Sequence, residues 1–202
     1  MYQQKGIMDL ETYIYQCLKP DHPESLVSRR KVAKGSYIYI PPNKPSEMYQ
    51  VRQGVIQIGS YTEEGQEICY DYLFRKEFFG NLRYLNGQFY EYAKAATACE
   101  LLTVDLHYFK FMIVHDPKVS DWFNKTVVER WCRAETRLFK ICTLNPAARL
   151  EALLKEFDYT VQDSERRPNY IPDLLSITDI AHLTGLTRQT VSKLLKKLEC
   201  GV

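Results

Sequence analysis

The chain has 202 residues, of which 45% are hydrophobic and 26% are charged, and its net charge is +2. This composition predicts a globular protein of one or two domains and excludes both a disordered chain and a polycation. Any contact with nucleic acid must therefore come from a local basic face. We find no apolar run of signal-peptide length at the start and none long enough to cross a bilayer. We expect a cytoplasmic protein without membrane contact.

The six cysteines and four histidines are scattered along the chain. No two cysteines form a CxxC pair, and no histidine has a partner at the spacing of a zinc site. We therefore expect reduced thiols, with no metal and no cofactor. The alternative, an iron–sulfur or redox sensor, would need clustered cysteines. The chain also lacks a nucleophile–base motif and a phosphate-binding glycine loop, so we identify no catalytic residues and do not expect an enzyme.

The first half of the chain predicts a short helix followed by a β domain. Residues 9–19 have the apolar spacing of an amphipathic helix. From about residue 32 to residue 104, short β-rich runs alternate with turns, as is typical of an antiparallel sandwich or barrel. The expected strands lie at residues 36–40, 48–51, 55–58, 68–73, 95–98 and 101–104, and a short helix is expected at 107–114.

A boundary at Asp116-Pro117 precedes one long helical pattern, over residues 118–142. Its length of about 24 residues corresponds to roughly 36 Å. Two interpretations of its apolar stripe stay open: the helix packs on its own β domain, or it pairs with the same helix of a second copy. A stripe this wide and aromatic allows both. The stripe consists of Val119, Trp122, Phe123, Thr126, Val127, Trp131, Ala134, Leu138 and Ile141.

A second helical region follows. Asn145 can cap a helix that has Pro146 at its first position. Residues 158–173 are polar and contain two prolines, so we expect a loop there.

Residues 175–199 predict two helices joined by a tight turn. Ser176 to Asp179 fits a capping box at the start of the first helix, and Thr187 can cap the second. Ala181 is small enough for the helices to approach closely, and Gly185 permits the turn between them. This is the pattern of a helix-turn-helix.

The second helix of this pair has two different faces. The leucines at 194, 195 and 198 and Val191 are expected to point inward. The polar face suits a DNA major groove, because arginine can hydrogen-bond guanine and glutamine can hydrogen-bond adenine. A merely solvated face is the alternative. The candidate DNA-binding residues are Thr187, Arg188, Gln189, Thr190, Ser192, Lys193, Lys196 and Lys197, of which the threonines, Lys196 and Lys197 are expected on phosphates.

The order of these parts resembles the CRP/FNR superfamily of bacterial transcription regulators. The motifs that carry the resemblance are Lys34-Gly35, Gln53-Gly54, Glu64-Gly65, the run from Lys76 to Gly80, the run from Ala96 to Leu102 and the run from Leu186 to Leu195. The resemblance implies an α+β fold: an antiparallel β-roll of the double-stranded β-helix or jelly-roll type, a long dimerisation helix and a C-terminal helix-turn-helix. It divides the chain into a sensor domain at 1–115, a dimerisation helix at 116–142 and a DNA-binding domain at 143–202.

The sequence departs from this family at the effector site. Cyclic-nucleotide binders place Glu after the glycine equivalent to Gly80, whereas this chain has Asn81-Leu82. They hold the phosphate with Arg-Ser where this chain has Phe89-Tyr90. An anionic phosphate needs a cation or converging N–H donors, so we predict that cAMP is not the effector.

Two further residues bear on the effector site. A Thr-Ser pair that contacts cAMP in the family falls at Ala134-Glu135, and Glu135 would repel a phosphate. The pocket could instead take an apolar or aromatic molecule bordered by Leu82, Phe89, Tyr90 and Trp131. The interpretation we favour is that these aromatic side chains fill the roll.

A second departure lies at residues 199–202, where the family's β-hairpin wing would follow and is essentially missing from the sequence. The resemblance implies a sequence-specific regulator that binds double-stranded DNA as a homodimer, with RNA polymerase as a partner if it activates. An unidentified effector, if there is one, would act through the long helix and a hinge near residues 143–145. The alternative is a sensor or protein-interaction module of the same fold that has lost DNA binding.

Overall fold

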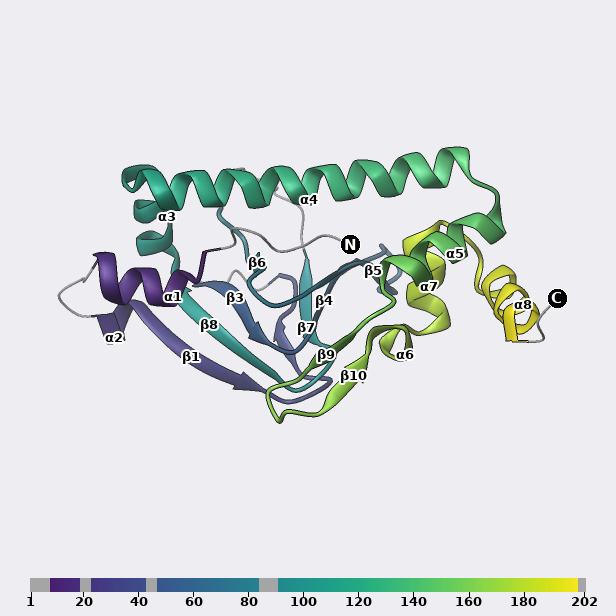
Figure 1. Cartoon of the computed structure of the whole chain (residues 1–202), viewed down its shortest axis with the longest axis horizontal. Coiled ribbons are helices and arrows are strands. Elements are labelled where there is room, and N and C mark those ends of the chain that lie inside the picture. The colour runs from purple at the N-terminus through teal and green to yellow at the C-terminus, as the bar shows by residue number, and fades with distance from the viewer. Residues whose placement is uncertain (1–7, 19–22, 43–46, 84–90, 200–202) are drawn as a thin grey trace.

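Two four-stranded antiparallel sheets lie beneath one long helix in the computed structural model, which describes residues 8–18, 23–42, 47–83 and 91–199 (Figure 1). The first sheet has the order β1-β8-β3-β6 and the second the order β2-β7-β4-β5. The strands are β1 (Val27–Val32), β2 (Tyr37–Tyr39), β3 (Glu47–Gln53), β4 (Ile56–Tyr61), β5 (Glu67–Leu73), β6 (Phe78–Phe79), β7 (Tyr92–Ala95) and β8 (Cys99–Asp105).

Apolar side chains from both sheets fill the interior of this β-roll. Ile56 and Ile58 of β4 point inward at every second position, as the period of a strand requires, and both are fully buried. The rings of Tyr39, Tyr49 and Phe79 pack together, with the centroids of Tyr49 and Phe79 5.1 Å apart. In the described part of the roll, these aromatic side chains supply core packing. Trp131, which the sequence analysis favoured as a side chain that fills the roll, is 62% exposed on α4.

The predicted α+β roll is confirmed, with two differences in its strands. The strand expected at 95–98 lies instead at 92–95, because Ala96 to Ala98 form a bend. The sequence analysis did not predict β1 and β6. The four middle residues of β1 are exposed and include three cations, so the strand shows no apolar alternation.

Two helices begin where the sequence predicted, after the boundary at Asp116-Pro117 and at the Asn145 cap. Asp116 accepts hydrogen bonds from the backbone N–H groups of Lys118 and Val119 at 2.9 and 2.8 Å. Asn145 caps the next helix through the N–H of Ala148. The N-terminal helices are α1 (Leu10–Tyr13), which continues into the π-helix η1 (Ile14–Leu18), and α2 (Pro23–Leu26). The others are α3 (Leu106–His115), α4 (Pro117–Thr143), α5 (Pro146–Glu156), α6 (Ile171–Leu174), α7 (Ile177–Thr184) and α8 (Arg188–Glu199).

The loop expected at 158–173 is wrong. The segment forms a hairpin of β9 (Thr160–Gln162) and β10 (Pro168–Tyr170), and then α6. Buried Asp163 holds the hairpin tip by accepting the N–H groups of Glu165 and Arg167. Two three-residue strands are too short to show a period in the sequence, which explains the error.

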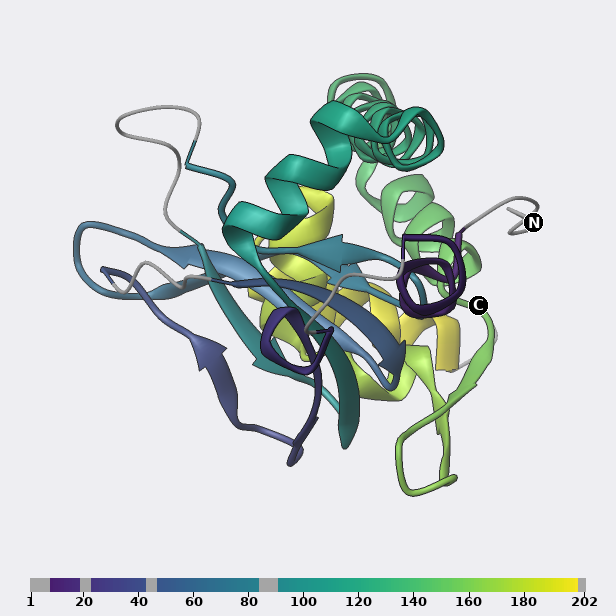
Figure 2. The same ribbon diagram turned by 90° about the vertical axis from the view of Figure 1, so that its left-hand side faces the viewer.

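Helix α4 contacts the roll through two kinds of side chain. Its first half is apolar: Trp122 and Phe123 pack on Phe78 at ring distances of 5.6 and 5.2 Å. Farther along, the residues that face the roll are the cations Arg130, Arg133 and Arg137. Figure 2 shows α4 nearly end-on above the sheets. A surface helix normally turns an apolar face toward the core. In the second half of α4, that face is largely cationic.

These cations join α4 to its neighbours on both sides. Arg137 donates to the carbonyl oxygen of Tyr70, and its Nη2 lies 3.3 Å from Asp71 of β5 and 3.7 Å from Glu156 of α5. Arg133 pairs with Glu77 and Asp71. Burial alone would lower the pKa of Arg133, but the two carboxylates outweigh burial and raise it. The guanidinium therefore stays charged and ties α4 to the roll.

We predict that Asp71→Asn destabilises the protein by about 2–3 kcal/mol, because it leaves two partly buried arginines short of a counter-charge. The carboxylate of Asp71 is 13% exposed. Urea denaturation measures the change in the free energy of unfolding.

The matched control is Asp121→Asn. The carboxylate of Asp121 forms an exposed ion pair with Lys125, and both residues lie on α4. The substitution should change the stability by about 0.5 kcal/mol or less. Equal effects of the two substitutions would contradict the structural role given to Asp71.

Candidate nucleic-acid interface

The turn between α7 and α8 is built as the sequence predicted. Ser176 Oγ accepts the N–H of Asp179 at 3.0 Å, and the carboxylate of Asp179 accepts the N–H of Ser176 at 3.0 Å, so the capping box is complete. Gly185 ends α7 with φ of 64°, in the left-handed region that glycine adopts without strain. A Cβ at this position would also lie 3.2 Å from a methyl group of Ile141 on α4. Both observations explain the glycine.

Helix α8 is anchored by one fully buried side chain. Val191 is 0% exposed and packs in a cluster with Leu153, Ile180 and Leu183. Thr187 Oγ1 accepts the N–H of Thr190 at 3.2 Å, which confirms Thr187 as the cap. The helix is thus held by its inner face and its first turn, while its polar face is left outward.

The predicted inner face of α8 is correct only in part. Leu194 and Leu195 are half-buried and pack against the same cluster as Val191. Leu198 is 47% exposed, so its assignment to the inner face is wrong. It lies in the last turn of α8.

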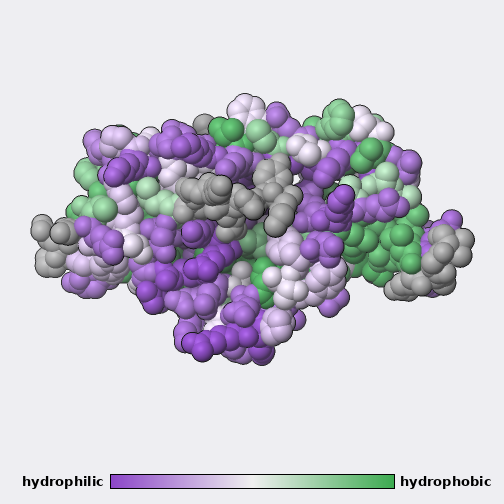
Figure 3. All heavy atoms as spheres, in the orientation of Figure 1, coloured by the Kyte–Doolittle hydropathy of each residue, from purple (hydrophilic) through white to green (hydrophobic). Residues whose placement is uncertain are grey.

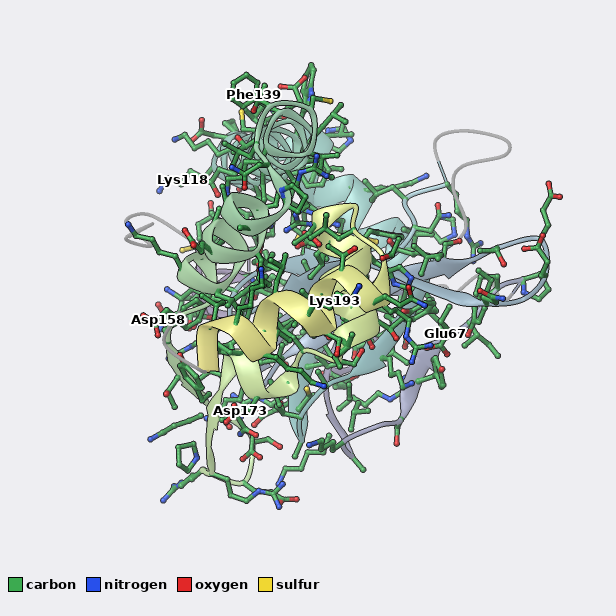
Figure 4. All side chains as sticks on the ribbon, turned by 90° about the vertical axis from the view of Figure 1, so that its right-hand side faces the viewer. Glu67, Lys118, Phe139, Asp158, Asp173 and Lys193 are labelled. Carbon is green, nitrogen blue, oxygen red and sulfur yellow. The ribbon has the colours of Figure 1, made fainter. Side chains whose placement is uncertain are left out.

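The candidate DNA-binding residues share the outward face and the first turn of α8. Ser192 and Thr190 are half-exposed, and the other six are exposed: Thr187, Arg188, Gln189, Lys193, Lys196 and Lys197. None of the four cations among them forms an ion pair with a described acidic side chain. Figure 4 shows Lys193 on the side of α8 that faces away from the roll. The helix therefore presents cations without described acidic partners beside hydroxyl and amide groups, which suits phosphates and base edges.

The sequence analysis missed that α7 packs on the outer face of the roll. Asp179 accepts a hydrogen bond from Gln57 Nε2 of β4 at 2.7 Å. His182 Nδ1 accepts the backbone N–H of Cys69 of β5 at 3.2 Å. Burial and the nearby carboxylate of Asp179 raise the pKa of the Cys69 thiol to about 12. Nothing in the sequence signals these contacts, because they join residues more than 110 positions apart.

The side of α4 that faces away from the roll is apolar between Val127 and Phe139. Its large hydrophobic side chains are 41% to 66% exposed, and they are Val127, Val128, Trp131, Leu138 and Phe139. Trp131 follows Val127 by four residues and Val128 by three, and Leu138 follows Trp131 by seven, so these side chains share one face of the helix, as in a coiled-coil seam. Figure 3 shows green atoms along the upper edge, where α4 runs, and Figure 4 shows Phe139 on the outer side of the helix. The predicted stripe is thus divided, its first part covered by the roll and its second part exposed.

The predicted effector residues fall into separate places. Gly80 has φ of 122°, and a Cβ there would lie 2.9 Å from the sulfur of Met48. Asn81 accepts the N–H of Arg83, and Leu82 packs half-buried against the cluster below α4. The predictions for Phe89 and Tyr90 lie outside the described residues.

The effector residues predicted on α4 lie on its outer side. Trp131 is 62% exposed, and its indole N–H donates to Glu135 Oε1 at 2.6 Å. Ala134 and Glu135 are exposed too. Within one protomer, these three residues border solvent rather than the roll interior.

A half-buried carboxylate that the sequence analysis missed lies beside the buried ring of Tyr39. Glu91 accepts hydrogen bonds from the hydroxyl groups of Tyr39 and Tyr70. Burial, and then the charge of Glu91, raise the pKa of Tyr39. An anionic group at this place would meet a negative charge.

Among the described residues, no three His, Cys, Asp or Glu side chains are grouped as a metal site would require. None of the helices in the same part of the chain is both long and apolar enough to cross a membrane.

Comparisons with known proteins agree with this architecture. The family model of the cyclic nucleotide-binding domain matches residues 29–116. The cAMP-activated global transcriptional regulator CRP of Haemophilus influenzae is 22% identical over 158 residues, which cover 75% of this chain and 68% of that protein. The same regulator of Salmonella typhimurium is 24% identical over 162 residues, which cover 77% and 75%.

Solved structures share the fold at low sequence identity. FixK2 from Bradyrhizobium japonicum is 18% identical with a TM-score of 0.67, and the match covers 87% of this chain and 86% of that one. The global regulator CLP of Xanthomonas campestris is 15% identical with a TM-score of 0.67, and the match covers 88% of each chain. The curated relatives are transcription regulators and not enzymes, in agreement with the sequence analysis.

Proposed function

Because the chain belongs to the CRP/FNR family of transcription regulators, we propose that it binds double-stranded DNA sequence-specifically as a homodimer, with α8 of each protomer in the major groove. Regulators of this family bind DNA. The observation that carries the proposal is the outward face of α8, where four cations without described acidic partners lie beside hydroxyl and amide groups.

The side chains of α8 divide by position into two roles. Arg188, Gln189, Ser192 and Lys193 lie in the first half of the helix and read bases. Lys196 and Lys197 lie in the last turns and contact phosphates. Thr187 and Thr190 sit at the start of the helix, where hydroxyl and N–H groups suit a phosphate oxygen.

The second copy of the chain pairs along α4. Five large hydrophobic side chains are exposed on one face of the helix, and only another apolar surface removes them from water. The helix has 27 residues, or roughly 40 Å, which is long enough for a continuous seam. In a two-fold pair, the two α8 helices then address half-sites about 34 Å apart.

The signal that regulates binding is an effector other than cAMP, or none. A cyclic phosphate in the roll would have to approach Glu91, whose carboxylate already accepts two phenol groups. An effector in the roll would act through α4, the hinge at residues 143–145 and the ion pairs of Arg137. In this scheme residues 1–115 sense, 116–142 pair the protomers and 143–202 bind DNA. RNA polymerase is the further partner if the protein activates transcription.

We predict that Arg188→Ala and Gln189→Ala relax the sequence preference, each costing about 1–3 kcal/mol at the preferred site. Lys196→Ala should weaken binding to all sequences alike, because a phosphate contact carries no sequence information. Fluorescence anisotropy with the preferred and an unrelated duplex, at several salt concentrations, measures both effects.

The control for these variants is Lys118→Ala, which removes an exposed cation from the first turn of α4, away from α8 (Figure 4). It should leave the affinity unchanged. Equal weakening of every sequence by all three α8 variants would contradict the roles assigned here.

We predict that Leu138→Glu converts the dimer to a monomer, with dimer affinity lowered by at least roughly 100-fold, since a charge would enter the apolar seam. Sedimentation equilibrium gives the mass. Leu138 is 60% exposed and Phe111 of α3 is 58% exposed, so Phe111→Glu is the matched control and should remain dimeric. A monomeric parent protein, or a dimeric Leu138→Glu variant, would refute the α4 seam.

We predict that cAMP at micromolar concentration does not change the melting temperature, because a ligand that binds only the folded state must raise it. A thermal-shift titration of the full chain is the measurement. A saturable rise in that range would show that our exclusion of cAMP is wrong.

A further inference from the structure

Strand β5 is an edge of the second sheet, and side chains of two helices take up its backbone groups. His182 Nδ1 of α7 accepts the N–H of Cys69 at 3.2 Å, and Arg137 of α4 donates to the carbonyl oxygen of Tyr70. An open edge strand is a surface that folded proteins usually cover. α7 covers part of this edge, and it lies between the roll and α8 in contact with both (Figure 1).

The first turn of α7 is built against the roll. One oxygen of the Asp179 carboxylate accepts both the N–H and the hydroxyl group of Ser176, as part of the capping box. The other oxygen accepts Gln57 Nε2 of β4 at 2.7 Å. A hydrogen bond to an ionised acceptor is stronger than one between neutral groups. The side chain that starts α7 therefore also ties this start to β4.

The roll and the helix-turn-helix share one apolar core at this contact. Val55 and Tyr72 of the roll are at most 1% exposed, and they belong to the same cluster as buried Ile180 of α7. The inner face of α8 belongs to this cluster too. The tip of the β9–β10 hairpin adds a hydrogen bond from the N–H of Ser164 to the carbonyl oxygen of Ala98 at 3.0 Å. Because protein interiors are close-packed, parts that share a core move together.

We propose that Gln57 and His182 are positioning residues, which clamp α7 to β4 and β5 and so set the distance and the angle between the two α8 helices of the dimer. The proposal rests on the dimeric DNA binding proposed above. Without the clamp, only residues 143–145 would connect each α8 domain to its α4, and so short a hinge leaves the orientation of a domain open. With the clamp, the dimer accepts one spacing of half-sites. The roll thus takes part in choosing the DNA site without touching it.

The variant that opens the clamp is Gln57→Glu, which sets a carboxylate against that of Asp179 and leaves the sequences of α7 and α8 unchanged. Gln66→Glu is the matched control, because it adds the same charge to the exposed turn between β4 and β5. The repair variant combines Gln57→Glu with Asp179→Asn. Its new amide can donate to the new carboxylate, which restores the hydrogen bond in the opposite direction, and its oxygen can still accept the N–H of Ser176.

Hydrogen exchange of the full chain tests the clamp without DNA. We expect the Cys69 amide to exchange at least roughly tenfold faster in Gln57→Glu than in the parent protein, because α7 then no longer covers β5. Exchange should be unchanged in Gln66→Glu and restored in the repair variant. Mass spectrometry of the peptide that contains residues 67–73 is the measurement. Unchanged exchange of this peptide in Gln57→Glu would refute the clamp.

Fluorescence anisotropy with duplexes that carry one or two copies of the preferred half-site tests the consequence for DNA. Two base pairs added between the half-sites shift them by about 7 Å and rotate them by about 70°. The parent protein should then lose at least roughly tenfold in affinity, whereas Gln57→Glu and His182→Ala should lose less than about threefold and bind the single half-site as the parent does.

The sensitivity to spacing separates a positioning role from a loss of stability, which would weaken binding at every spacing alike. Equal sensitivity in the parent, Gln57→Glu and His182→Ala would refute the positioning role and leave the proposed function intact. A parent protein that prefers no DNA sequence would instead overturn the proposed function, and with it the positioning role, even where hydrogen exchange shows the clamp.

Discussion

The ion pairs of Arg137 are the interaction on which the arrangement of the molecule depends. This one side chain, at the middle of the second half of α4, contacts Asp71 of the roll and Glu156 of α5. It therefore joins α4 to a strand of the roll 66 positions earlier in the sequence and to the helix that follows α4. In the second half of α4, arginines occupy the side that faces the roll. The apolar side chains there face outward. An effector or partner that displaced α4 would have to break or shift these pairs, so the site couples the roll to the helix-turn-helix.

The positions of α4 and α8 in the fold determine where the apolar face of α4 and the basic face of α8 lie. α4 runs the length of the molecule, and α8 lies near its C-terminal end (Figure 1). Pairing two copies along α4 would place two α8 helices on one side of the dimer, as a two-fold DNA site requires. α7 adds a constraint, since Gln57 and Cys69 of the roll hold it by hydrogen bonds. The helix pair of α7 and α8 thus has a defined place relative to the roll as well as to α4.

Sequence reasoning succeeded where a local rule decides the structure. The boundary at Asp116 and the caps at Asn145 and Ser176 were predicted, and each of these side chains accepts N–H groups at the start of a helix. The outward residues of α8 were found from helical periodicity alone. Sequence reasoning failed where packing between distant segments determines the structure. Examples are the charged strand β1, the short hairpin and the packing of α7 on the roll. Which part of the α4 stripe is covered also depends on the roll, and the sequence pattern does not contain that information.

The most direct test of a dimeric DNA-reading regulator is selection of binding sites by the full chain from a pool of random duplex DNA. The structure leads us to expect enrichment of a two-fold symmetric sequence, with half-sites about 10 base pairs apart from centre to centre. Enrichment of no sequence over the starting pool would contradict sequence-specific reading by α8. It would favour a sensor or protein-interaction module that has kept this fold without reading DNA.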